Sequence, residues 1–340
     1  MSSVPCSHVL DGDAAKIMSN EPTLPADVSR DAFQSLRKLE NNVASVFLGK
    51  PEVIRLALVT LLAEGHLLIE DVPGIGKTLL AKALARSLGC SFHRIQFTPD
   101  LLPSDLLGSS VFHQGTSTFV FQPGPLFTQV VLADEINRAT PRTQSALLEA
   151  MSDRQVSLDG KTHPLGPPFF VLATQNPYEF EGTYPLPESQ LDRFLMRVRI
   201  GYPEREAEKQ IMTGHRAGEP VEHLHAVLSA EEVVHLQHEV RQVRVEETLM
   251  DYLLDLITAT RYHPDIHLGG STRAALSLYR ASQALALLEG RDYVVPDDIK
   301  RLVSAVLSHR ILPRMTRRDS SANAAEEIVR DILAQTPIPQ

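Results

Sequence analysis

The sequence predicts an α/β protein in which a doubly wound parallel sheet is followed by a smaller all-α domain. Over residues 29–203, short apolar runs alternate with segments of helical periodicity. From Pro203 onward, helical patterns follow one another with no clear strand. We therefore predict an α/β core at 29–203 and a helical domain at 204–315, between a flexible N-terminal arm at 1–28 and a C-terminal tail at 316–340.

The elements of the core are expected in a regular order. Apolar spacing predicts a first helix over residues 30–46, and Pro51 at a favourable first position starts a second that stops at Gly65. Thr140 is expected to cap a helix over residues 141–151. Two β-hairpins are expected near residues 110–122 and around 155–165. The predicted strands of the sheet are residues 67–70, 92–97, 129–133, 169–174 and 196–200.

The helical domain shows one strong start signal. Ser229, with Glu232 three residues later, forms a capping-box pattern. Further helices are expected over residues 246–262, 272–288 and 296–309, and a last one within the tail over residues 322–333.

Composition limits the classes of function. The 340 residues are 43% hydrophobic and 22% charged, as in ordinary globular proteins, and the net charge of -9 does not favour a nucleic-acid surface. Two cysteines, Cys6 and Cys90, cannot build a disulfide framework or a zinc motif. The N-terminus shows no apolar signal segment, and the most apolar stretch, residues 54–69, is short and carries charges. We expect a cytoplasmic protein.

A glycine-rich turn between the first strand and the next helix is the strongest functional signal. Glycines let backbone amides wrap around phosphate oxygens, and a helix N-terminus adds partial positive charge. Lys77 is expected to reach the β- and γ-phosphates, and the Thr78 hydroxyl to ligate Mg²⁺. The first glycine of the phosphate-loop pattern is replaced by Asp71, whose carboxylate must point away from phosphate. The candidate nucleotide-binding residues are Gly49, Pro73, Gly74, Ile75, Gly76, Lys77, Thr78 and Leu79.

Two adjacent acids end a later apolar strand. If that strand lies beside the phosphate loop, Asp134 can hold Mg²⁺ and Glu135 can polarise the attacking water. A buried strand also delivers Asn176, whose amide can contact the γ-phosphate and the water, although an asparagine before a proline is also a common turn residue. Arg193 and Arg273 are candidates for neutralising charge on the γ-phosphate, with a plain surface role as the alternative.

Taken together, these motifs resemble those of the AAA+ ATPases, and specifically the MoxR family, over roughly residues 30–312. The resemblance is carried by five segments: residues 68–78, 133–139, 144–151, 173–177 and 182–194. It implies that Lys77, Thr78, Asp134 and Glu135 bind ATP and Mg²⁺. It also implies Asn176 as sensor 1 and Arg273 as sensor 2. Arg193 is implied as the arginine finger that reaches a neighbouring subunit's ATP, and Arg138 is the alternative for that role.

The resemblance also implies a mechanical function. Relatives of this kind form rings, commonly hexamers, that remodel or activate a protein client, often together with a partner that contains a von Willebrand factor A domain. The expected activity is Mg²⁺-dependent hydrolysis of ATP to ADP and phosphate. One alternative is a motor that acts on nucleic acid, against which the acidic charge counts. Another is a small-molecule kinase, for which Glu135 suits water better than a substrate hydroxyl.

Overall fold

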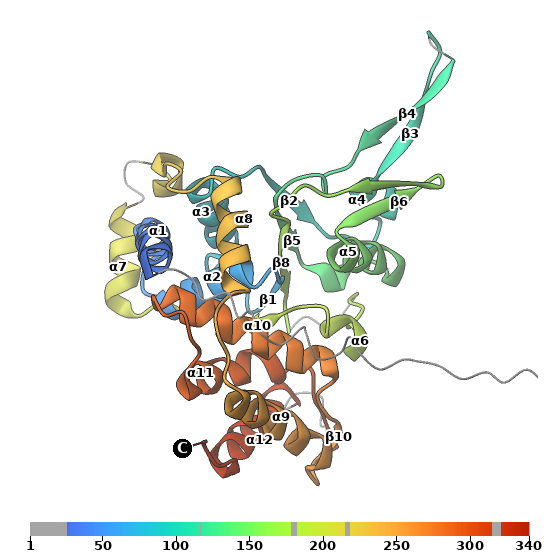
Figure 1. Ribbon diagram of the computed structural model, residues 1–340. Helices are drawn as coiled ribbons and strands as arrows, with labels where there is room; N and C mark the ends of the chain where they lie inside the picture. The colour runs from blue at the N-terminus through green and yellow to red at the C-terminus, as the bar shows by residue number, and fades with distance from the viewer. Residues whose placement is uncertain (1–25, 116, 178–181, 215–217, 315–320, 340) are drawn as a thin grey trace, which may run out of the picture.

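The computed structural model describes residues 26–115, 117–177, 182–214, 218–314 and 321–339. An α/β layer lies on a layer of helices from the C-terminal part of the chain, and a long hairpin projects from the α/β layer (Figure 1). Helix α1 (Ala26–Ala44) begins inside the segment predicted to be a flexible arm. The rest of that arm lies outside the described residues.

The central sheet confirms the predicted fold class. Its five strands among the described residues are all parallel, in the order β2-β5-β8-β1-β9. They are β1 (Leu67–Glu70), β2 (Phe92–Gln96), β5 (Val130–Asp134), β8 (Phe170–Gln175) and β9 (Met196–Val198). Since β1 lies between the later strands β8 and β9, the loops after these strands meet at one edge, where open α/β sheets bind ligands.

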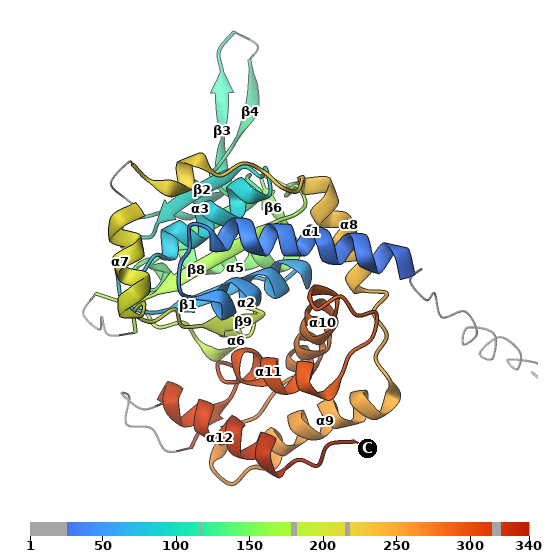
Figure 2. The same cartoon turned by 90° about the vertical axis from the view of Figure 1, so that its left-hand side faces the viewer.

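Both faces of the sheet are covered, because side chains of a strand alternate between its faces. Leu67 and Ile69 of β1 pack into the core formed with helices α1, α2 (Pro51–Leu62) and α3 (Lys77–Ser87). Leu68 packs on the opposite side, in the core formed with α4 (Pro103–Leu107) and α5 (Pro141–Asp153). Figure 2 shows α1, α2 and α3 together on one side of the sheet. This burial explains why β1 is apolar without alternation.

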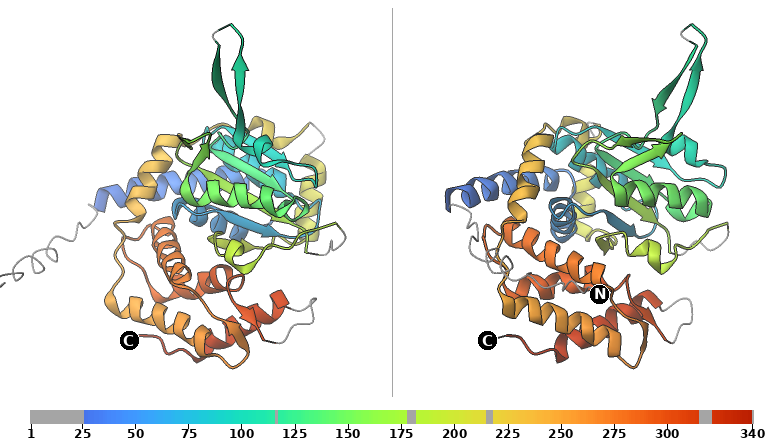
Figure 3. Two further views of the ribbon diagram at one scale, coloured as in Figure 1. Left: turned by 90° about the vertical axis from the view of Figure 1, so that its right-hand side faces the viewer. Right: turned by 45° about the vertical axis from the view of Figure 1, so that its right-hand side comes forward.

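Both predicted hairpins are present. Strands β3 (Gly108–His113) and β4 (Thr118–Pro123) pair antiparallel and extend away from the body of the protein (Figure 3). Strands β6 (Gln155–Leu158) and β7 (Lys161–Pro164) form the second, shorter hairpin.

The C-terminal half is helical, as predicted, with one correction. Strands β10 (Ile266–Leu268) and β11 (Leu312–Pro313) pair antiparallel, so the expectation of no strand beyond Pro203 is wrong. Segments of two or three residues leave no periodic pattern in a sequence. The helices are α7 (Arg205–Gly214), α8 (Ala230–Val240), α9 (Glu247–Tyr262), α10 (Thr272–Leu288), α11 (Pro296–Leu307) and α12 (Ser321–Gln335).

The helix ends follow the predicted signals in part. The capping box of α8 is formed, with Ser229 Oγ accepting from the Glu232 amide and the Glu232 carboxylate accepting from the Ser229 amide. Thr140 precedes α5 but makes no capping hydrogen bond, because its hydroxyl contacts that of Thr143 instead. After α2, the left-handed residue is Glu64 (φ 56°) rather than Gly65.

Helix α12 belongs to the helical layer. It packs against α9 and α11 and buries Ala325, Val329 and Ile332. The helix predicted over residues 322–333 is therefore present, and its buried side chains belong to the main core.

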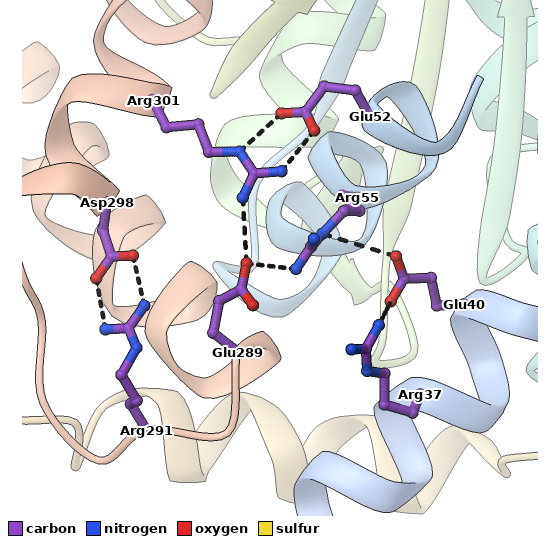
Figure 4. A network of polar contacts seen from close by, with 8 residues as sticks. All are labelled: Arg37, Glu40, Glu52, Arg55, Glu289, Arg291, Asp298 and Arg301. Carbon is purple, nitrogen blue, oxygen red and sulfur yellow. Dashed lines mark hydrogen bonds and ion pairs between the residues drawn. The ribbon is translucent and has the colours of Figure 1, made fainter.

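A network of ion pairs joins the two layers (Figure 4). Glu289, which follows α10, accepts from Arg55 of α2 and from Arg301 of α11, at 2.5 and 3.1 Å. Arg301 also pairs with Glu52 in the first turn of α2, at 2.6 Å. The network thus connects α2, which packs on the sheet, with the end of α10 and with α11 in the helical layer.

Candidate functional site

A cavity of about 680 Å³ lies at the carboxyl edge of the sheet. The phosphate-loop candidates from Pro73 to Leu79 line it, together with Asp134 and Glu135. The rest of the lining includes the apolar or aromatic residues Phe47, Leu48, Ile200, Tyr202 and Met212, together with the charged residues Lys50, Lys82, Arg94, Glu208 and Glu219. A cavity lined by both polar and apolar groups suits a molecule that carries phosphates and a flat base.

The loop after β1 has the backbone that phosphate binding requires. Gly74 and Gly76 take φ values of 84° and 96°, which other residues rarely adopt. Helix α3 begins directly afterwards, at Lys77. Its first amide groups have no partners within the helix, so they can donate to an anion at the cavity wall.

Asp71 points away from this wall, as the sequence requires. Its Oδ2 accepts hydrogen bonds from the amides of Ile200 and Gly201, at 2.9 and 2.7 Å, and its Oδ1 accepts from the Val72 amide at 2.8 Å. The carboxylate therefore ties the start of the phosphate loop to the segment after β9. An acid in place of the usual glycine has a structural function here and does not face the cavity.

Lys77 is held over the loop. Its Nζ donates to the Asp71 carbonyl oxygen at 2.6 Å, and the residue is only 8% exposed. Burial lowers the pKa of Lys77 from its ordinary value, and the carboxylates of Asp134, Asp71 and Glu135 oppose that change. A buried cation with spare donors is well placed to bind phosphate oxygens.

Thr174 connects the two acids at the end of β5. Its hydroxyl donates to Asp134 Oδ1 at 2.5 Å and accepts from the Glu135 amide at 2.9 Å. Glu135 takes a left-handed backbone conformation (φ 59°, ψ 49°), which is strained for a residue with a Cβ. Strain of this kind persists where the surroundings impose it, and the neighbouring β8 imposes it here through Thr174.

Three further side chains orient these acids. Arg94 pairs with Asp134 Oδ2 at 2.6 Å, Gln96 donates to Glu135 Oε2 at 2.8 Å, and Arg138 lies 3.3 Å from the same Glu135 oxygen. Sequence analysis did not single out Arg94, Gln96 or Thr174. The available signal was a polar residue near the end of each strand that flanks β5.

The donor set fits a hydrated magnesium ion. Thr78, in the first turn of α3, and Asp134, at the end of β5, line the same cavity and supply the hydroxyl and carboxylate oxygens that Mg²⁺ prefers. Asp134 already faces a cation, because its Oδ2 pairs with the Arg94 guanidinium at 2.6 Å.

Two other candidates lie nearby without lining the cavity. Asn176 comes directly after β8, between the strands that carry the phosphate loop and the two acids. Gly49 turns the chain between α1 and α2 with φ 77°, and a Cβ there would lie 2.7 Å from that of Ala207. Its neighbours Leu48 and Lys50 line the cavity, so Gly49 shapes the wall without forming it.

Arg193 and Arg273 lie elsewhere. Both line a second cavity of about 500 Å³, and neither lines the first. Arg193 follows α6 (Glu188–Leu191) and donates to the Leu148 carbonyl oxygen at 2.8 Å. Arg273 is an exposed residue in the first turn of α10. The first cavity is bordered by α7 and the 3₁₀ turn Pro220–His223, which belong to the segment predicted as the helical domain at 204–315, whereas α9 to α12 do not border it.

Known proteins share this arrangement. A family model described as "ATPase family associated with various cellular activities (AAA)" matches residues 66–196, and an AAA lid domain matches residues 258–332. "Chaperone MoxR1" of Mycobacterium tuberculosis is 41% identical over 339 residues, which cover 97% of this chain and 89% of that protein. The chain belongs to the MoxR family of AAA+ ATPases. The family explains why a phosphate loop, two acids and a helical lid occur in one chain.

Two further comparisons agree with this membership. "Uncharacterized protein YeaC" of Bacillus subtilis is 47% identical over 309 residues, 91% of this chain and 96% of that protein. The solved structure of a candidate ATPase from Cytophaga hutchinsonii superposes with a TM-score of 0.85 at 38% identity, covering 92% and 98% of the two chains. As in the sequence-based expectation, no helix of the described residues of this MoxR protein has the length and apolar character needed to cross a membrane.

Proposed function

We propose that this MoxR protein hydrolyses ATP in the cavity beside the phosphate loop, with Mg²⁺ as its cofactor. The observation that supports this most is Glu135, a strained acid at the cavity that Thr174, Gln96 and Arg138 hold in one orientation. A carboxylate held this way can accept a proton from water as it attacks. No substrate hydroxyl is needed for that reaction, which favours a hydrolase over a kinase.

The remaining residues bind and orient. The amides of Gly74 to Thr78 and the Lys77 amine hold the phosphates, and the apolar wall around Phe47 and Tyr202 holds the base. Thr78 and Asp134 would hold Mg²⁺, which, when bound, neutralises charge on the phosphates. Asn176 is proposed to orient the attacking water from the end of β8.

The binding part of this proposal is tested with Lys77→Ala. Loss of the buried amine should weaken the affinity for a fluorescent ATP analogue by about tenfold or more, because a charge-assisted contact is removed. Lys209→Ala is the control, since Lys209 is exposed on α7, pairs with Glu206 and does not line the cavity. Equal affinities for the two variants would exclude Lys77 from phosphate binding.

We further propose that the protein works as a ring, for which we expect six subunits. Arg193 and Arg273 share a cavity that is separate from the nucleotide cavity of their own chain, which supports the proposal that they serve the nucleotide of another copy. An Arg193→Ala subunit keeps its own nucleotide cavity, and a Lys77→Ala subunit keeps its arginines. Mixing the two inactive variants should restore hydrolysis at mixed interfaces, whereas no recovery would argue against action in trans.

Hydrolysis is proposed to drive the remodelling of a protein client in the cytoplasm, with a von Willebrand factor A domain protein as partner. The support is the family itself, in which one relative is named a chaperone. A Glu135→Gln protein, locked with ATP, should capture the client and partner, and capture should be lost with ADP. Identification of ATP-dependent partners without such a domain would contradict the partner proposal.

A further inference from the structure

A buried arginine lines the second cavity together with Arg193 and Arg273. This residue, Arg310, follows α11 and is 5% exposed. Its partner is Asp192, the residue directly before Arg193. The pair therefore connects the α/β layer with the helical layer at the point where both present an arginine.

The guanidinium group of Arg310 is fully used. Nε donates to Asp192 Oδ1 at 2.8 Å, and the two terminal nitrogens donate to groups on both sides of the boundary. On the α/β side these are the carbonyl oxygens of Asp192, Phe194 and Leu195, and on the helical side they are the carbonyl oxygen of Val306 and the Ser277 hydroxyl. A lysine has three donors and no planar fork, so it could not make this set of contacts.

The second oxygen of Asp192 reaches the start of α10. Asp192 Oδ2 accepts from the Ser271 hydroxyl at 3.3 Å, and Ser271 Oγ in turn accepts from the Ala274 amide as the N-cap of α10. Arg273 lies in this capped turn. The Asp192 carboxylate thus contacts the start of the helix that carries Arg273, and Asp192 itself directly precedes Arg193 in the sequence.

We propose that Asp192 and Arg310 are positioning residues that hold Arg193 and Arg273 as one rigid unit facing the nucleotide of the neighbouring subunit. This inference rests on the proposed action of the two arginines in trans. It adds that Arg193 of the α/β layer and Arg273 of the helical layer cannot change position independently of each other. A misplacement of about 1 Å at a reacting phosphate can cost about a hundredfold in rate, so such a unit would matter for turnover.

The ionisation of the pair is consistent with this function. Burial lowers the pKa of Arg310 to about 10, and Asp192 opposes the change. Arg310 therefore stays protonated at neutral pH, and its contacts with Asp192 remain charge-assisted.

The test measures donation of arginines in trans. The acceptor is the Arg193→Ala subunit, whose own nucleotide cavity is intact. The reference donor is Lys77→Ala, whose own nucleotide binding is weakened and whose arginines are unchanged. Test donors carry Lys77→Ala together with Asp192→Ala, or with Asp192→Asn, whose amide can still accept from Arg310. The control donor adds Asp298→Ala, which breaks the buried Arg291–Asp298 pair within the helical layer.

The Asp192→Ala donor should restore less than about a tenth of the reference rate, because both contacts of the carboxylate are lost. The Asp192→Asn and Asp298→Ala donors should restore at least about half, and KM for ATP should match the reference in every mixture, since the acceptor's cavity is unchanged. An Asp192→Ala donor as good as the reference would overturn the inference while leaving the proposed function intact. A loss equal to that of Asp298→Ala would reduce Asp192 to a general stabilising role and also overturn it. If the reference donor itself restores nothing, action in trans fails, and the inference with it.

Discussion

Replacing Thr174 by valine removes one hydroxyl that serves both acids of the site. The shape of the side chain is kept, but Asp134 loses a hydrogen bond of 2.5 Å and the Glu135 amide loses its acceptor at 2.9 Å. A hydrogen bond to a charged group contributes about 1.5–3 kcal/mol and a neutral one about 0.5–1.5 kcal/mol. We expect Thr174→Val to lower the free energy of unfolding by about 2–4 kcal/mol, since Thr174 is fully buried.

The activity should fall further than the stability explains. Without its acceptor, the strained backbone of Glu135 can relax, and we expect kcat for ATP hydrolysis to drop by about tenfold to a hundredfold at temperatures where the protein is folded. The control is Thr143→Val, because Thr143 is also fully buried and its hydroxyl donates to the Leu101 carbonyl oxygen at 2.7 Å, away from the cavity. Thr174→Ser should retain most activity. Equal kcat values for Thr174→Val and Thr143→Val, measured by phosphate release, would refute the reasoning.

Three other perturbations test separate parts of the structure. Asp71→Ala should lower the free energy of unfolding by about 2–4 kcal/mol and weaken ATP binding, because three amides lose a charged acceptor. Urea unfolding measures the first effect and nucleotide titration the second, and an unchanged ATP affinity would contradict the prediction. Burial lowers the pKa of His66 to about 4, so the native state binds fewer protons than the unfolded state below about pH 6.5. The contribution of neutral His66 to the free energy of unfolding is therefore complete above that pH and decreases as the pH falls toward 4. Between about pH 7 and pH 5, the wild-type protein should lose about 2 kcal/mol of stability through His66, and His66→Gln should not show this loss. An identical pH dependence in both proteins would exclude His66 as the cause. Glu289→Gln should cost about 1 kcal/mol at low salt, because Arg55 and Arg301 lose a shared partner, and a cost that persists at about 1 M salt would argue against an electrostatic origin.

The sequence was informative wherever local chemistry determines the structure. The strand–turn–helix of the phosphate loop follows from an apolar run, two glycines and a helix start, and each is visible in a few residues. The same holds for the capping box at Ser229 and for the two hairpins. The position of Asp71 away from phosphate was also expected, because a carboxylate facing phosphate would be repelled.

Sequence reasoning did not reach what depends on contacts between distant segments. Thr174 lies forty positions from Asp134, and only the parallel pairing of β5 with β8 brings them together. Likewise, Arg193 and Arg273 are far apart in the sequence, and only the folded chain brings them to one cavity that is separate from that of Lys77. The termination of α2 shows the same limit: Gly65 is required because its Cα lies against Leu195, where a Cβ would approach to 2.4 Å.

The central claim is that Glu135 acts on water in a cavity that binds ATP. The most direct measurement compares phosphate release and ATP affinity for the wild-type protein and Glu135→Gln. The amide keeps the size of the side chain and an oxygen that can accept from Gln96, but it cannot take a proton. We therefore predict a fall in hydrolysis of about a hundredfold or more, with ATP affinity within about threefold of wild type. Turnover equal to that of the wild type would contradict the account.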